Sequence, residues 1–225
     1  MRIVPATCET ALMQIVCLLF DGLTALDIVG PYEVLQRLPD ANVQFVAPKA
    51  GAVRTDNGFL SLVADAPISD VASADIVVIP GGFATRQLES DTTVLEWIRA
   101  IDATTTWTTS VCTGSMLLAA AGLLEGKEAT CHWASLERLR EYGAIPTGRR
   151  VVEQGKTVTA AGVSSGIDMA LTLAARIGGD ELAQAIQLAI EYDPQPPFDA
   201  GSLDKAPQPV VERLAAMYSR RGISS

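Results

Sequence analysis

The chain has 225 residues, 48% of them hydrophobic, and its formal net charge is -9. This length and apolar content suit one compact domain, and the acidic balance excludes nucleic acid and anionic membranes as expected partners, because both carry negative charge. The longest apolar run, residues 116–124, is about half as long as a membrane-spanning helix, so no membrane partner is expected.

The first residues differ in character from the rest of the chain. Residues 1–12 carry one arginine and no apolar segment of signal-peptide length, so we expect a cytoplasmic protein. We interpret residues 1–12 as a disordered extension and residues 13–225 as a single α/β domain. Either Met1 or Met13 could be the true start.

The pattern of apolar residues predicts alternating strands and helices. Several strands are continuous apolar runs, as in parallel sheets that helices cover on both faces. We therefore predict an α/β fold with a doubly wound, mostly parallel sheet and helices on both faces, decorated by hairpins around residues 58–62 and 150–161. The predicted strands span residues 14–20, 43–47, 76–79, 107–111 and 157–161. The predicted helices span residues 30–38, 91–102, 113–124, 135–142, 164–177, 181–192 and 209–221.

Chemically suggestive residues follow three of these strands. Asp27 lies beyond the first strand, Gly81 and Gly82 follow residues 76–79, and Cys112 follows residues 107–111. Ligands of open α/β sheets bind beyond the carboxyl ends of the strands, where such loops converge. We therefore expect these residues to share one site.

Cys112 stands where a β-branched strand runs into a helix of small residues. A strand-to-helix turn without Gly or Pro at its apex holds the apex residue in a strained conformation, as in a nucleophile elbow. Unpaired N–H groups and the dipole of the helix should lower the pKa of the thiol and favour the thiolate. The alternative is a buried structural cysteine.

Asp27 lies between Leu26 and Ile28, just before a predicted helix. Its plainest role is an N-cap of that helix. Alternatively, its carboxyl group is partly buried close to the Cys112 thiolate, and its pKa is then raised because two adjacent anions share one proton. Glu33 is the rival carboxylate, which we expect to face solvent.

Gly82 could place a backbone N–H group in the site. Together with the N–H group of Thr113 it could form an oxyanion hole over Cys112. The alternative is that Gly81–Gly82 is an ordinary tight turn.

The remaining cysteines and the single histidine exclude other chemistries. Cys8, Cys17, Cys112 and Cys131 form no CxxC pair, and one histidine rules out a multi-histidine metal site. We expect no metal and no cofactor. Residues 162–166 lack the histidine that a Cys-His-acid triad needs, and we interpret His132 as a buried, hydrogen-bonded structural residue, so ordinary amide hydrolysis has no general base.

Several segments together resemble the ThiJ/PfpI superfamily of class I glutamine amidotransferase-like proteins, which have a flavodoxin-like fold and a cysteine nucleophile elbow. The resemblance runs from about residue 14 to about residue 206. Within that superfamily, the chain is most similar to the isonitrile hydratases. The segments that carry the resemblance are LDIVGP at 26–31, IPGG at 79–82, SVCTGS at 110–115, TCHW at 130–133 and EYDPQPPFDAG at 191–201.

The resemblance implies roles for three residues. Cys112 would be the nucleophile, Asp27 the acid/base and Thr113 an assisting residue, and the protein would be a homodimer. The small-molecule isonitrile substrate would react with water to give an N-substituted formamide. Cys131 departs from the relatives, which usually have threonine there.

The residue types at these positions also suit this chemistry when the resemblance is set aside. An isonitrile must receive a nucleophile and a proton at the same terminal carbon, so a cysteine beside a protonated carboxyl group can form a thioimidate that water then hydrolyses. Two alternatives stay open. One is a glyoxalase or deglycase acting on 2-oxoaldehydes, and the other is a non-enzymatic redox or ligand sensor based on Cys112.

Overall fold

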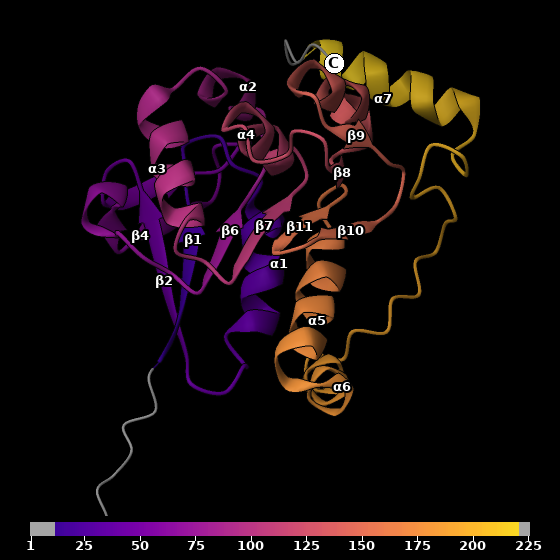
Figure 1. The fold of residues 1–225 in the computed structure, drawn as a ribbon. Coiled ribbons are helices and arrows are strands. Elements are labelled where there is room, and N and C mark those ends of the chain that lie inside the picture. Colours follow the sequence, from indigo (N-terminus) through magenta and orange to yellow (C-terminus); the bar gives the residue numbers. More distant parts are fainter. Residues whose placement is uncertain (1–11, 221–225) are drawn as a thin grey trace, which may run out of the picture.

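The computed structural model describes residues 12–220, so nearly all of the extension predicted over residues 1–12 lies outside the described residues. A seven-stranded sheet forms the centre, in the order β10-β11-β7-β6-β1-β2-β5 (Figure 1). Every neighbouring pair is parallel except β10 and β11. The strands are β1 (Met13–Leu18), β2 (Ala41–Ala47), β5 (Ala66–Pro67), β6 (Ile76–Ile79), β7 (Trp107–Val111), β10 (Val151–Gln154) and β11 (Thr157–Ala160).

Helices cover both faces of this sheet, which confirms the predicted doubly wound α/β fold. On one face, α1 (Ala25–Leu35) packs against α5 (Ser165–Gly178), and α6 (Asp180–Ala189) packs on α5. On the other face, α3 (Thr92–Asp102) packs against α4 (Gly114–Ala120). The winding direction reverses beside β1, and the loops that follow β1 and β6 meet at that point.

Short elements decorate the sheet. The hairpin around residues 150–161 is confirmed as the antiparallel pair β10 and β11. The strands β3 (Gly51–Arg54) and β4 (Ser61–Ala64) form the other predicted hairpin. The remaining short elements are η1 (Ile68–Asp70), α2 (Thr85–Leu88), β8 (Glu128–Ala129), the 3-10 helix η2 (Trp133–Tyr142) and β9 (Ile145–Pro146).

The chain ends its described part with a helix on the far side of the molecule from α6. An extended segment leads from α6, at the lower end in Figure 1, to α7 (Gln208–Arg220) at the upper end. α7 therefore lies near the carboxyl ends of the strands, where it reaches the site described below.

Two predicted helices have wrong boundaries for identifiable reasons. The helix predicted over residues 30–38 instead begins at Ala25 and ends at Leu35, because Pro31 lies inside the helix rather than in its first turn. The helix predicted over residues 113–124 ends at Ala120, and the chain soon turns through Gly122, whose φ is 81°.

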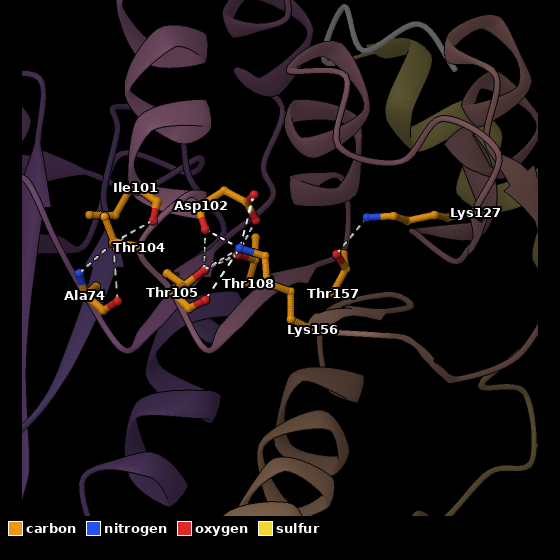
Figure 2. A network of polar contacts seen from close by, with 9 residues as sticks. All are labelled: Ala74, Ile101, Asp102, Thr104, Thr105, Thr108, Lys127, Lys156 and Thr157. Carbon is orange, nitrogen blue, oxygen red and sulfur yellow. Dashed lines mark hydrogen bonds and ion pairs between the residues drawn. The ribbon is translucent and has the colours of Figure 1, made fainter.

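A polar network closes the sheet at the end of β7 opposite to Cys112 (Figure 2). Lys156, in the turn between β10 and β11, forms an ion pair with Asp102 of α3 at 3.3 Å and a hydrogen bond with the Thr105 hydroxyl at 3.4 Å. The Thr108 hydroxyl donates to Asp102 at 2.6 Å. The network ties the hairpin to the loop that enters β7, so β7 is anchored at the end where it begins.

Candidate active site

Cys112 sits at a strained elbow between β7 and α4. Its φ is 59°, a left-handed value that is rare for a residue other than glycine, which confirms the predicted strain. The turn is tight because α4 lies directly on β6: a Cβ atom at Gly114 would be 2.2 Å from the carbonyl oxygen of Ile79. The Cys112 N–H group donates to the carbonyl oxygens of Ala160 and Ala161 at 3.1 and 2.8 Å, which fixes the elbow to β11.

The electrostatics of Cys112 differ from the prediction. The N–H groups of Val163 and Thr113 point to the sulfur and lower the pKa of the thiol, as expected at a helix start. Burial outweighs them: the residue is only 5% exposed, and this desolvation, reinforced by the charge of Asp27, raises the pKa of the Cys112 thiol. The predicted lowering of the Cys112 pKa is therefore wrong.

Asp27 is fully buried next to this thiol. Its Oδ2 atom accepts a hydrogen bond from the Gly81 N–H group at 2.9 Å, and its Oδ1 atom has no partner with hydrogen-bond geometry among the described residues. Burial raises the pKa of Asp27 to about 7, although the Gly81 N–H group and the Cys112 thiol act to lower it. The expected raised pKa of Asp27 is confirmed, but its cause is burial and not the neighbouring sulfur. The N-cap role is wrong, because Thr24 occupies that position and Asp27 lies in the first turn of α1.

The Gly81–Gly82 turn brings its backbone close to two of the candidate site residues, Asp27 and Thr113. A Cβ atom at Gly81 would be 2.5 Å from the Thr113 nitrogen and 2.9 Å from Oδ2 of Asp27. The Gly82 N–H group donates to the Thr113 hydroxyl oxygen at 2.9 Å. The loops after β1, β6 and β7 thus meet without side chains between them, and the Gly82 N–H group is held by Thr113 in this conformation.

A pocket of about 630 Å³ opens above Cys112 and Thr113. Cys112 lines the side of this pocket that we call its floor, whereas Asp27 is fully buried and does not line the pocket. Sequence reasoning missed most of the wall, since its residues come from loops and helices that only the tertiary fold brings together. Missed wall residues include Thr24, Asp56, Arg86, Arg138 and Tyr218.

His132 and Glu33 behave largely as predicted. His132 Nδ1 accepts a hydrogen bond from the Ala134 N–H group at 3.3 Å, and burial lowers the pKa of the imidazole. His132 also lines the pocket, which the structural interpretation did not include. Glu33 forms an ion pair with Arg37 and its side chain is 49% exposed, so the rival carboxylate faces solvent.

Two further classes of site are absent from residues 12–220. No group of three or more His, Cys, Asp or Glu side chains there is arranged to hold a metal ion. No helix in the same range is both long and apolar enough to cross a membrane.

The sequence and fold match known proteins over most of the chain. An isonitrile hydratase from Pseudomonas putida is 45% identical over 89% of this chain and 87% of its own length. The crystal structure of a ThiJ/PfpI family protein from Pseudomonas syringae superposes with a TM-score of 0.89 at 35% identity, covering 97% of this chain and 92% of that one. The HTH-type transcriptional regulator CdhR from Pseudomonas aeruginosa is 31% identical over 59% of this chain but only 40% of its own length. Residues 13–176 match the DJ-1/PfpI family, and the chain belongs to that family.

Proposed function

We propose that this protein is an isonitrile hydratase that converts isonitriles and water into N-substituted formamides. The observation that carries the proposal is the buried pair of Asp27 and Cys112, in which a carboxyl group with a pKa near 7 faces a thiol at the floor of a pocket. The 45% identity to the isonitrile hydratase of Pseudomonas putida supports the same reaction.

The first step joins the substrate to Cys112. The carboxylate of Asp27 accepts the thiol proton through its unpartnered Oδ1 atom, and the sulfur attacks the terminal carbon of the isonitrile. Asp27 then returns the proton to that same carbon. The product is a thioimidate, R–N=CH–S–Cys112, and Asp27 is again a carboxylate.

The second step releases the product. Asp27 accepts a proton from water while the water oxygen bonds to the thioimidate carbon, and Asp27 then gives this proton to the nitrogen, so that R–NH–CH(OH)–S–Cys112 forms and the carboxylate is restored. The carbon–sulfur bond then breaks, the hydroxyl proton passes to the sulfur, and the formamide R–NH–CHO leaves. A pKa near 7 suits a group that must both accept and donate a proton at neutral pH.

Thr113 and Gly82 hold the reacting atoms in place in this proposal. The Thr113 N–H group stabilises negative charge on the sulfur, consistent with its effect on the thiol pKa. The Gly82 N–H group is bound to the Thr113 hydroxyl, so a rotation of that hydroxyl would free it to contact the intermediate. Both residues therefore serve as substrate-positioning groups.

The test is formamide production from an aryl isonitrile by the purified protein, with Cys112→Ala as the control. We expect turnover by the wild type and none by the variant. Absence of turnover by the wild type on both aryl and alkyl isonitriles would overturn the proposal. Consumption of methylglyoxal by that same protein would then favour a 2-oxoaldehyde enzyme.

We also infer that the active protein is a cytoplasmic homodimer. Large apolar side chains stand out on the described surface, including Phe59 at 91% exposure and Phe198 at 80%. Covering these rings with a second copy of the chain would remove apolar surface from water, which favours association. Sedimentation velocity should give about twice the 23.7 kDa mass of the chain, and a monomer at micromolar concentration would contradict the inference.

A further inference from the structure

The wall of the pocket above Cys112 carries charged groups whose partners differ. Arg138 is already neutralised: its guanidinium group makes two hydrogen bonds with Glu89, at 3.2 and 2.6 Å. Glu89 also accepts a hydrogen bond from the Tyr142 hydroxyl at 2.8 Å. Arg138 therefore serves the structure of the wall and has little charge to offer a ligand.

Asp56 is the acidic residue of the wall. Its carboxylate accepts a hydrogen bond from the Thr24 hydroxyl at 2.9 Å, and its N–H group donates to the carbonyl oxygen of Leu23 at 2.9 Å. It comes from the loop between β3 and β4, whereas the arginines of the wall come from α2 and η2. The positive and negative groups of the wall thus belong to different elements.

Arg86 of α2 is the remaining arginine of the wall. It is exposed and has neither an ion pair nor a hydrogen-bond partner among residues 12–220. The chain holds 26 acidic and 17 basic residues, and eight described basic side chains pair with an acidic one. In such an acidic protein, an unpaired guanidinium at the pocket that leads to Cys112 is available to an anionic ligand.

We propose that Arg86 recognises a carboxylate on the molecule that enters this pocket. Combined with the proposed function, on which this part of the inference rests, the substrates are isonitriles whose R group carries a carboxylate. The reactive carbon must reach Cys112 at the floor, so the R group extends along the wall towards the mouth. A guanidinium binds a carboxylate there through two parallel N–H bonds, which a neutral amide cannot match.

The first test needs no isonitrile. Iodoacetate and iodoacetamide both alkylate a thiol and have nearly the same size, but only iodoacetate is anionic. The ratio of their alkylation rates at Cys112, followed by peptide mass spectrometry, reports the charge felt at the pocket. We expect Arg86→Gln to lower this ratio by about fivefold, the size of one nearby charge interaction in a solvated site.

Matched variants separate a local contact from a change in net charge. Arg99→Gln removes one exposed arginine outside the pocket and should leave the iodoacetate-to-iodoacetamide ratio unchanged. Arg86→Lys keeps the positive charge and should therefore keep most of the wild-type ratio. An unchanged ratio in Arg86→Gln, or an equal fall in Arg99→Gln, would overturn the proposal.

The second test uses isocyanoacetate and isocyanoacetamide, which differ in the same way. We expect the wild type to favour isocyanoacetate in kcat/KM and Arg86→Gln to lose that preference. If neither compound is turned over while the alkylation ratio depends on Arg86, anion recognition stands and the isonitrile function falls. If both are turned over without regard to charge and the ratio ignores Arg86, the function stands and the role of Arg86 falls.

Discussion

Asp27 and Cys112, both buried, form the dyad that exchanges protons in the proposed reaction. Burial raises the cost of ionising both groups, and the charge of Asp27 adds to that cost for Cys112, whereas the Cys112 thiol stabilises the ionised form of Asp27. Below neutral pH, both groups are protonated and no base is available for the thiol. Above it, the dyad carries one negative charge, which can reside on the carboxylate or, during attack, on the sulfur.

The dyad predicts the pH dependence of the reaction. Because Asp27 must be ionised to accept the thiol proton, and its pKa is raised to about 7, kcat/KM should rise through about that pH and then level off. Initial rates of formamide formation across the neutral range measure this profile. A rate that stays constant from weakly acidic to weakly alkaline pH would contradict the proton role of Asp27.

The close packing around Gly81 predicts a large effect of Gly81→Ala on activity. Gly81→Ala would place a Cβ atom 2.6 Å from the Thr113 hydroxyl oxygen and 2.9 Å from Asp27, so these groups must move. Displacement on this scale should cost on the order of 100-fold in kcat/KM. Gly148→Ala is the matched control, because its added Cβ meets nothing within 4 Å. Equal activity of the two variants would show that this close contact has no role.

A property of these residues could be predicted where its cause lies in the neighbouring residues of the sequence, and could not where its cause is tertiary packing. The apolar neighbours of Asp27 indicated a buried carboxyl group, and its pKa is indeed raised. The Cys112 prediction weighed the helix start correctly, but the burial that reverses the pKa shift depends on tertiary packing. Arg86 and Asp56 carry no local signal, because a single charged residue in a one-turn helix or a loop is usually solvated.

At the scale of elements, the strands that carry the site were the easiest to predict. β6 and β7 have the predicted bounds, since β6 (IVVI) is a short apolar run and β7 (WTTSV) is rich in β-branched residues, both in the middle of the sheet. α2, with four residues, is too short to show a periodic pattern, and it holds Arg86. The start of α1 was misplaced because Gly30 and Pro31 look like a helix start, whereas Gly30 lies against Ile167 of α5, where a Cβ would come within 3.0 Å.

The network around Lys156 should stabilise the sheet without affecting the chemistry. Lys156→Met would remove the ion pair with Asp102 and the hydrogen bonds with Thr105, whereas Lys127→Met would remove one weak bond to Thr157, at 3.3 Å. Because Lys156 is 38% exposed, solvent screens the pair, and we expect a loss of only about 1 kcal/mol.

Urea unfolding of the two lysine variants measures that difference. Lys156→Met should be the less stable, and both should keep wild-type kcat/KM. A larger loss in Lys127→Met would contradict the assigned role of the network.

At the scale of the whole molecule, the fold gathers the site where its winding reverses. The segments that follow β1, β6 and β7 supply Asp27, Gly81 and Cys112. α7 returns from the far end of the chain and places Tyr218 in the wall, where its ring and that of Phe83 meet in an edge-to-face contact at a centroid distance of 6.0 Å. The convergence of the three loops was predictable from the parallel sheet. The contribution of α7 was not, because nothing in its sequence specifies where it docks.

The buried carboxyl group should also affect global stability. Its pKa is about 7 in the folded protein against a model value of 3.8, so the folded state holds its proton more tightly than the unfolded state. Raising the pH between these two values therefore destabilises the wild type. Asp27→Asn has no carboxyl group and so does not lose stability in this way. The unfolding free energy of the variant, relative to that of the wild type, should therefore increase by roughly 2 kcal/mol between about pH 5 and pH 8.

Urea unfolding of wild type and Asp27→Asn at the two pH values tests this linkage. Glu33→Gln is the control, since that carboxylate is half exposed and its variant should show little change with pH. An Asp27→Asn advantage that is the same at both values would mean that Asp27 is already ionised in the folded protein.

The most direct measurement of the central claim compares two properties of Asp27→Asn in one preparation: formamide turnover and alkylation of Cys112 by iodoacetamide. The amide keeps the shape of the side chain but moves no proton. We therefore predict that Cys112 remains open to alkylation while turnover is lost. Undiminished turnover in this variant would contradict the account, because the proton would then come from a group other than Asp27.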